Sequence, residues 1–297
     1  MTVGFDLVAD AVPTRDAATV VLARPSPAGP EIFFVKRHAD VRFMGGAYVF
    51  PGGKLDGADC DEALRCDLGE SDASARLGES DGRRARGLFV AALRECFEEA
   101  GVLLVDATPE PDELAQMRAL VATNPGALAA EIATRGWTFR ATALHAFARW
   151  VTPRGETRRY DTRFFAAQVP ENTVAAHDTG ETVASAWLRP VDALARARDG
   201  QIVLVPPTYR TVQWLADCET VDEILALAST PPPRFEPVVR TDDEGTLWIV
   251  LPGDPLHPEP APEFPPRSHP SVVRAAAETV RVTRFAYDGG AWRPSRG

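Results

Sequence analysis

Three glutamates lie close together in the stretch LRECFEEAGV, which runs from Leu93 to Val102. Glu95, Glu98 and Glu99 are spaced i, i+3 and i+4, so a helix would carry all three on one side. Like charges at these spacings destabilise a helix by about 0.2–0.5 kcal/mol per pair. A bound divalent cation would offset that repulsion, since Mg²⁺ is held by carboxylates together with substrate phosphates. A solvated acidic helix face is the alternative interpretation.

The helix that carries these glutamates is predicted over Leu88–Ala100, and Gly101 supplies the left-handed residue that ends it. At about 100° per residue, the side opposite the glutamates is apolar and is expected to pack against a sheet. Arg94 lies beside the glutamates and could orient one carboxylate through paired hydrogen bonds. The apolar stripe consists of Leu93, Cys96, Phe97 and Ala100.

The rest of the chain alternates between strand-like and helix-like segments, which indicates an α+β or α/β/α architecture with a mixed sheet. A hairpin is predicted first, from Ala18–Ala23 and Ile32–Arg37, because these β-rich runs flank a Pro/Gly-rich turn. Three later strands are predicted in ALHAFARWVTP, YDTRFFAAQVP and ETVASAWL. Further helices are predicted at Asp112–Val121, from Asn124 and Pro125 to Gly136, in PVDALARARDG, and within Thr208–Ala228.

Residues 1–230 are expected to form one domain, and residues 231–297 a Pro-rich extension that contains strands. The polar segment of about residues 57–87 lacks clear periodicity and is predicted to be a surface insertion. The extension could pack on the core of its own chain or on a second subunit, so a homodimer is possible.

The composition argues against several classes of partner. The 297 residues carry a net charge of −10, which disfavours general binding to nucleic acid or to a membrane surface. The chain has no apolar run long enough to cross a membrane and no secretory signal pattern, so a cytoplasmic location is expected. An anionic substrate would then require a local basic patch or a metal ion.

The glutamate stretch and the upstream FPGGKLDGAD together resemble the Nudix hydrolase signature. Gly53 takes the place of the signature's first glycine, and Asp59 falls where the family usually has glutamate. Between Asp59 and Arg94 lie 34 residues where the pattern has seven. A loop tolerates such added length at low entropic cost. The second half of the signature matches at Arg94, Glu95, Cys96, Phe97, Glu98, Glu99, Ala100, Gly101 and Val102.

The resemblance implies an α/β/α Nudix sandwich and hydrolysis of a nucleoside diphosphate linked to another moiety. By this resemblance, the glutamates and the Gly52 carbonyl would bind Mg²⁺ or Mn²⁺. Glu95 would be a further metal ligand or the general base, and Arg94 would orient the glutamates, so that Arg94, Glu95 and Glu98 form the catalytic set. Additional acids would be Asp59 and Glu181, with Asp178 as a weaker candidate. The metal ligands implied in full are Gly52, Glu95, Glu98 and Glu99.

The segment before the signature, FFVKRHADVRFMGGAYVFPGG, resembles the motif of Nudix coenzyme A diphosphatases. Val35 and His38 replace hydroxyl residues of that motif. The long insertion and the later WVTPRGETRRYDTRFFAA resemble the branch that contains peroxisomal CoA diphosphatases and bacterial relatives, and they add Arg159 as a candidate. The substrate-binding residues implied are Arg37, Arg42, Gly46, Phe50, Gly53 and Arg159, since guanidinium groups suit the phosphates of CoA.

The leading hypothesis is therefore Mg²⁺-dependent hydrolysis of CoA or acyl-CoA to 3′,5′-ADP and (acyl-)4′-phosphopantetheine. Hydrolysis of ADP-ribose, NADH or another dinucleotide pyrophosphate is the enzymatic alternative. A Nudix-like domain that senses a nucleotide without cleaving it is an alternative of another class. Such domains commonly lose the glutamate pair or the arginine, whereas this chain keeps Arg94, Glu98 and Glu99.

Overall fold

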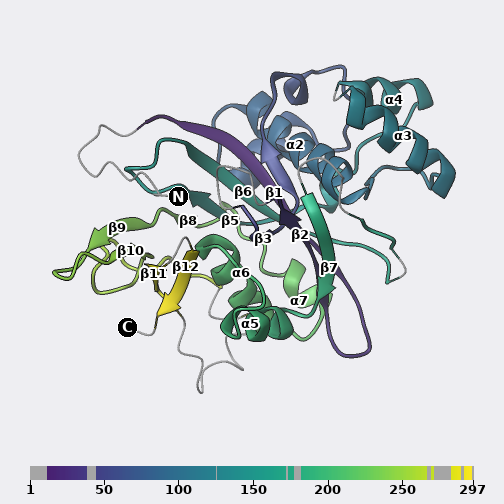
Figure 1. The fold of residues 1–297 in the computed structure, drawn as a ribbon. Coiled ribbons are helices and arrows are strands. Elements are labelled where there is room, and N and C mark those ends of the chain that lie inside the picture. Colours follow the sequence, from purple (N-terminus) through teal and green to yellow (C-terminus); the bar gives the residue numbers. More distant parts are fainter. Residues whose placement is uncertain are drawn as a thin grey trace.

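A mixed eight-stranded sheet forms the centre of the molecule (Figure 1). The computed structural model describes residues 12–38, 45–124, 126–171, 173–176, 182–265, 269–270, 282–288 and 291–295. The path of the sheet is β3-β2-β1-β6-β5-β8, with β4 paired to β1 and β7 paired to β2. The β1–β6 and β5–β8 pairs are parallel, and the remaining pairs are antiparallel. The strands are β1 (Thr14–Arg24), β2 (Glu31–Arg37), β3 (Tyr48–Val49), β4 (Gly52–Lys54), β5 (His145–Val151), β6 (Arg159–Gln168), β7 (Thr182–Leu188) and β8 (Arg234–Phe235).

Both faces of the sheet are buried, as the central strand β1 shows. Val20 and Leu22 belong to one hydrophobic cluster, whereas Val21 and Ala23 belong to another. Successive side chains of a strand point to opposite faces, so an unbroken apolar run such as VVLA needs cover on both sides. The predicted hairpin and mixed sheet are thus confirmed.

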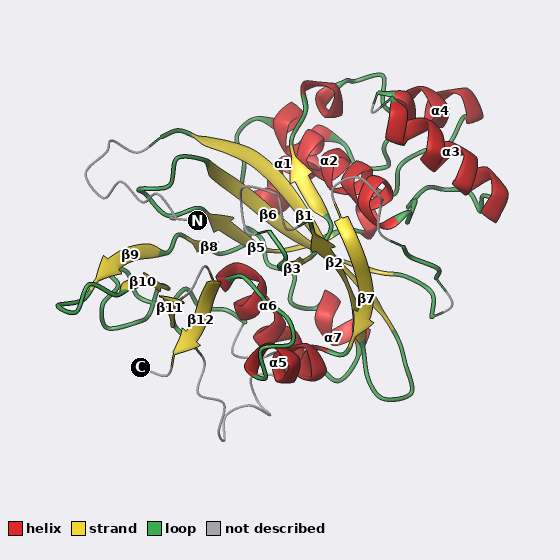
Figure 2. Ribbon diagram, in the orientation of Figure 1, coloured by secondary structure: helices red, strands yellow, loops and turns green. Residues whose placement is uncertain are grey.

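Helices cover the two faces in separate groups (Figure 2). Helices α1 (Glu70–Leu77), α2 (Gly82–Ala100), α3 (Pro111–Thr123) and α4 (Ala127–Arg135) contribute to the first cluster. Helices α5 (Pro190–Arg198), α6 (Pro206–Ala216) and α7 (Val221–Leu225) contribute to the second. Short 3₁₀ turns lie at Gly57–Cys60 and Ala141–Ala143. The expected α/β/α sandwich is confirmed. Within the described chain, none of the helices is both long and apolar enough to cross a membrane.

Helix α2 is longer than the sequence pattern indicated. It begins at Gly82 rather than near Leu88, and the Asp81 side chain caps it by accepting a hydrogen bond from the Arg84 backbone N–H at 3.0 Å. At the other end Gly101 has φ 70°, the left-handed conformation expected of a helix stop. The C-terminal part of α2, which carries the glutamates, is therefore fixed by a local signal.

The segment of residues 57–87 is more than a surface insertion, because part of it belongs to the core. The spacing of Ala73 and Leu77 gives α1 an apolar stripe, and both residues are buried. Ion pairs tie the segment to the sheet, since Glu79 contacts Arg163 and Arg84 contacts Asp16. The predicted surface insertion therefore also contributes side chains to the core. The buried apolar residues of the segment are Leu64, Leu68, Ala73, Leu77 and Ala85.

The Pro-rich C-terminal extension packs on the same chain. It begins with β8, the last strand of the central sheet, and continues as a four-stranded antiparallel sheet. Aromatic contacts join it to the core: Trp150 stacks on Phe235 at 4.9 Å between ring centroids, and Trp214 meets Phe264 edge-on at 4.7 Å. The strands of the second sheet are β9 (Val238–Thr241), β10 (Leu247–Val250), β11 (Arg284–Asp288) and β12 (Ala291–Ser295).

Candidate active site

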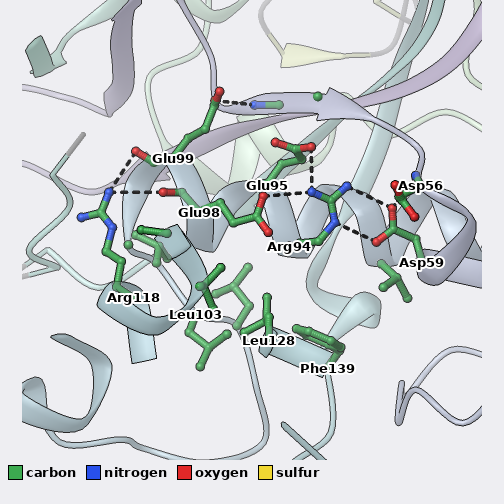
Figure 3. Close-up of a pocket in the computed structure, with 18 of the residues that line it drawn as sticks. Asp56, Asp59, Arg94, Glu95, Glu98, Glu99, Leu103, Arg118, Leu128 and Phe139 are labelled. Carbon is green, nitrogen blue, oxygen red and sulfur yellow. Dashed lines mark hydrogen bonds and ion pairs between the residues drawn. The ribbon is translucent and has the colours of Figure 1, made fainter. Parts of the chain in front are cut away.

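The acidic face of α2 lines a cleft of about 1790 Å³ (Figure 3). Glu95, Glu98 and Glu99 lie in a row along this face, as the helical spacing predicted. The short strand β4 runs beside the row, because it is paired with β1 and β1 lies against α2. One rigid helix and one strand thus bring carboxylates and backbone polar groups to the same place.

Glycines let the β4 backbone approach the carboxylates closely. The Gly52 N–H donates to Oε2 of Glu99 at 2.9 Å. A Cβ atom at Gly53 would lie 2.2 Å from Oε1 of Glu95, and a Cβ at Gly52 would lie 2.5 Å from the Ala18 carbonyl oxygen. No other residue type fits at either position without displacing a neighbour.

Arg94 holds the acidic side chains together. Its Nε and Nη2 donate to the two carboxylate oxygens of Asp59 at 2.8 and 3.0 Å. Its Nη1 donates to Oε1 of Glu95 at 2.8 Å and to Oε2 of Glu98 at 2.9 Å. Burial lowers the pKa of the guanidinium, but the bond to Asp59 and the surrounding carboxylates outweigh burial and raise it overall. Arg94 is therefore a fixed positive charge that orients three acids.

Asp59 reaches this network although a long segment separates it from Arg94 in the chain. It is only 2% exposed and also accepts the Asp56 backbone N–H at 2.8 Å, which closes a capping box. The extra residues therefore begin after Asp59. The structure places this acid beside Arg94, as its buried partner at one end of the carboxylate row.

Glu98 offers a carboxylate oxygen that could coordinate a hard cation such as Mg²⁺. Burial raises the pKa of its carboxyl to about 7 despite the opposing influence of Arg94. Its Oε1 atom is buried, and within the described residues it has no hydrogen-bond partner. A divalent cation would satisfy this oxygen, because Mg²⁺ takes oxygen ligands. Glu95 and Glu98 are turned toward Arg94, so in the described part of the chain no three ligating side chains converge on one point.

Basic side chains line the same cleft. Arg37, at the end of β2, and Lys54, at the end of β4, both face it, as does Arg158 just before β6. Tyr160 and Thr162 follow Arg158 at intervals of two residues and line the cleft as well. The cleft therefore offers separate cations for an anionic ligand beside the carboxylates.

Arg159 was predicted to bind substrate, and this prediction was wrong. Its side chain is only 7% exposed and does not line the cleft. It donates to the Thr152 carbonyl oxygen at 3.0 Å and to Oε1 of Glu236 at 2.7 Å. Alternate residues of a strand point to opposite faces, so Arg158 reaches the cleft and Arg159 faces away from it.

Two other predicted substrate-binding residues, Phe50 and Gly46, do not line the cleft. Phe50 is buried in the core, where its ring lies 5.2 Å from that of Phe34, and it does not line the cleft. Gly46 lies in a turn with φ 78°, away from the cleft lining, and its N–H donates to the Arg37 carbonyl oxygen at 3.1 Å. Arg42 and Glu181 lie outside the described residues, as does Asp178.

Arg118 on α3 lines the site, and no local sequence pattern predicts this position. Its Nη2 donates to the Ala176 carbonyl oxygen at 2.6 Å and to the Glu99 carbonyl oxygen at 3.3 Å. It therefore meets the C-terminal end of α2, where a positive charge interacts favourably with the carbonyls that lack a partner within the helix itself. Only the packing of α3 beside α2 brings this arginine to the helix that carries the glutamates.

Comparisons with known proteins agree with this geometry. The model of the family described as "NUDT19 Nudix domain" matches residues 83–215. The chain is 30% identical to the acyl-coenzyme A diphosphatase NUDT19 of Gallus gallus, over 82% of this chain and 80% of that protein. It is 29% identical to the Homo sapiens protein of the same name, with the same coverage.

A solved structure shows the same architecture. The crystal structure of a NUDIX hydrolase from Alicyclobacillus acidocaldarius superposes with a TM-score of 0.60 at 29% identity. The match covers 74% of this chain and 99% of that chain. The signature residues, the sandwich and the relatives all lead to one assignment: the chain belongs to the Nudix hydrolase family.

Proposed function

We propose that the protein hydrolyses the pyrophosphate bond of CoA or acyl-CoA, releasing 3′,5′-ADP and (acyl-)4′-phosphopantetheine. Nudix hydrolases generally use divalent metals, and here the ion would be Mg²⁺ or Mn²⁺. The observation that carries the proposal is the Arg94-centred row of Glu95 and Glu98, which faces the β4 glycines within a cleft lined by cations. The choice of CoA is supported by the relatives named acyl-coenzyme A diphosphatase.

The residues that would hold the cation are Glu98, Glu99 and Glu95, together with the Gly52 carbonyl. When bound, a divalent ion neutralises charge on phosphoryl oxygens and lowers the pKa of water. Glu98 fits this role because its buried Oε1 is without a hydrogen-bond partner in the described structure. Arg94 keeps Glu95 and Glu98 on the same face of α2 as Glu99, so the carboxylates that would hold the ion already lie close together.

Side chains of this protein are suited to accept the proton from water and to bind the phosphates of the substrate. Attack of water on a phosphorus breaks the P–O bond to the bridging oxygen and releases two phosphate monoesters and a proton. Glu95 is held by Arg94 at 2.8 Å and is suited to accept that proton if it is not itself a ligand. Arg37, Lys54 and Arg158 are suited to bind the phosphates, including the 3′-phosphate that distinguishes CoA from ADP-ribose.

The test is turnover of CoA by the purified protein with Mg²⁺ or Mn²⁺, with products identified by mass spectrometry. Reaction in H₂¹⁸O identifies the attacked phosphorus by the product that carries the label. Glu98→Gln should abolish turnover while CoA binding persists. Glu62→Gln, the same change at an exposed position, should leave turnover unchanged. Turnover of ADP-ribose or NADH without turnover of CoA would contradict the proposed substrate, and binding without turnover of any of them would favour a sensor.

A further inference from the structure

The cleft extends beyond the carboxylates into an apolar groove between α3 and α4. We call this region the α3 groove and define it by Leu103, Leu114, Ala115, Ala119, Leu128 and Phe139, all of which line the same cleft. Figure 3 shows Leu103, Leu128 and Phe139 along one side of the row formed by the glutamates and Arg94. The cleft volume of about 1790 Å³ exceeds the roughly 300–1,000 Å³ usual for a small-molecule site. The cleft can therefore hold more than a nucleotide.

One face of α3 forms the long wall of this groove. Its cleft-lining residues follow the i, i+3, i+4 spacing and extend for about 17 Å at 1.5 Å per residue. Ala115 and Ala119 on this face are exposed, so their short side chains leave space in the groove. Asp112 and Glu113 of the same helix are not part of the lining. The lining residues of α3 are Pro111, Leu114, Ala115, Arg118, Ala119, Val121 and Ala122.

We propose that the α3 groove holds the acyl-pantetheine arm of a thioester substrate and that Ala115 and Ala119 determine the acyl chain lengths that fit. This inference rests on the proposed function. The diphosphate must lie at the glutamates, so the two halves of the substrate leave the row in different directions. The cleft-lining cations Arg37, Lys54 and Arg158, none of which belongs to the α3 groove, suit the phosphorylated nucleotide. The apolar α3 groove suits a hydrocarbon chain.

Chain-length dependence of hydrolysis tests the inference. We expect kcat/KM to rise from acetyl-CoA to decanoyl-CoA by at most about fourfold per buried methylene, below micelle-forming concentrations. Ala119→Trp, which fills the groove, should lower the decanoyl-to-acetyl ratio of kcat/KM at least tenfold. Gln116→Trp places the same side chain on an exposed position of α3 that does not line the cleft, and it should keep the wild-type ratio. Ala115→Leu is a milder variant to use if Ala119→Trp does not fold.

Calorimetry in EDTA provides a second readout that does not require turnover. Burial of apolar surface gives a negative heat-capacity change, which should grow with acyl length in the wild type and in Gln116→Trp. In Ala119→Trp it should not grow. This measurement decides the groove assignment even if CoA is not hydrolysed, in which case the proposed function fails separately.

Several results would overturn the inference. One is a kcat/KM that does not depend on acyl length, and another is an equal decanoyl-to-acetyl ratio in Ala119→Trp and the wild type. A third is a change of oligomeric state in Ala119→Trp, measured by light scattering, with the ratio unchanged. That result would mean that a second copy of the chain occupies the α3 groove.

Discussion

Asp59→Asn is the most informative change at the carboxylate row, because it alters one charge without altering shape. Asp59 is 2% exposed and accepts two hydrogen bonds from Arg94, at 2.8 and 3.0 Å. Asparagine offers one acceptor oxygen, and its NH₂ group would face a guanidinium N–H. One of the two bonds is therefore lost, and Arg94 is less firmly held against Glu95 and Glu98.

The expected loss of stability follows from this geometry. A hydrogen bond to a charged group contributes about 1.5–3 kcal/mol. At about 2 °C per kcal/mol for a chain of this size, the melting temperature should fall by about 3–6 °C. Loss of a residue that orients metal ligands typically costs about 10–100-fold in metal affinity or activity. We therefore expect kcat/KM and apparent Mn²⁺ affinity to fall by that range.

Thermal melts, CoA hydrolysis and Mn²⁺ titration measure these effects. Asp61→Asn is the matched control, since Asp61 lies on the same segment, is exposed and caps the Ala63 backbone N–H without contacting Arg94. It should leave activity unchanged. If Asp59→Asn lowered the melting temperature but kept kcat/KM and Mn²⁺ affinity within twofold of the wild type, Asp59 would be only a structural residue. A role for Asp59 in positioning Glu95 and Glu98 through Arg94 would then be refuted.

Three further predictions each concern a single residue. Gly53→Ala should lower kcat at least tenfold with little change in melting temperature, because the alanine Cβ would lie 2.2 Å from Oε1 of Glu95. Full activity of this variant would contradict the close approach of β4 to Glu95. Arg118→Met should destabilise the protein by about 1–3 kcal/mol in urea unfolding, since the Glu99 carbonyl oxygen loses a charged donor. An unchanged midpoint of the urea transition would mean that Arg118 does not cap α2. Burial raises the pKa of Glu156 to about 7 from its ordinary value near 4.5, so the folded state loses stability as pH rises between these values. Glu156→Gln should therefore melt higher than the wild type at pH 8 and equally at pH 4, and a gain that is the same at both pH values would refute this assignment.

Most features of α2 could be predicted from the sequence. The spacing of its glutamates and its apolar stripe predicted one acidic face and one buried face, and both are confirmed, because helical period is a local property. Gly101 marked the end of the helix for the same reason. The start at Gly82 was not predicted, since it lies in a polar segment whose apolar residues find their partners only in the folded core.

The sequence alone determined the helix that carries the carboxylates, the Gly52–Gly53 pair and most of the strands of the central sheet, because each of these depends on residues close together in the chain. Tertiary structure alone decided which of Arg158 and Arg159 faces the cleft, since that depends on the register of β6 beside β1. It also decided that Asp59 pairs with Arg94 across 34 intervening residues and that Arg118 reaches the end of α2. These contacts arise from the packing of distant segments, for which no local pattern exists.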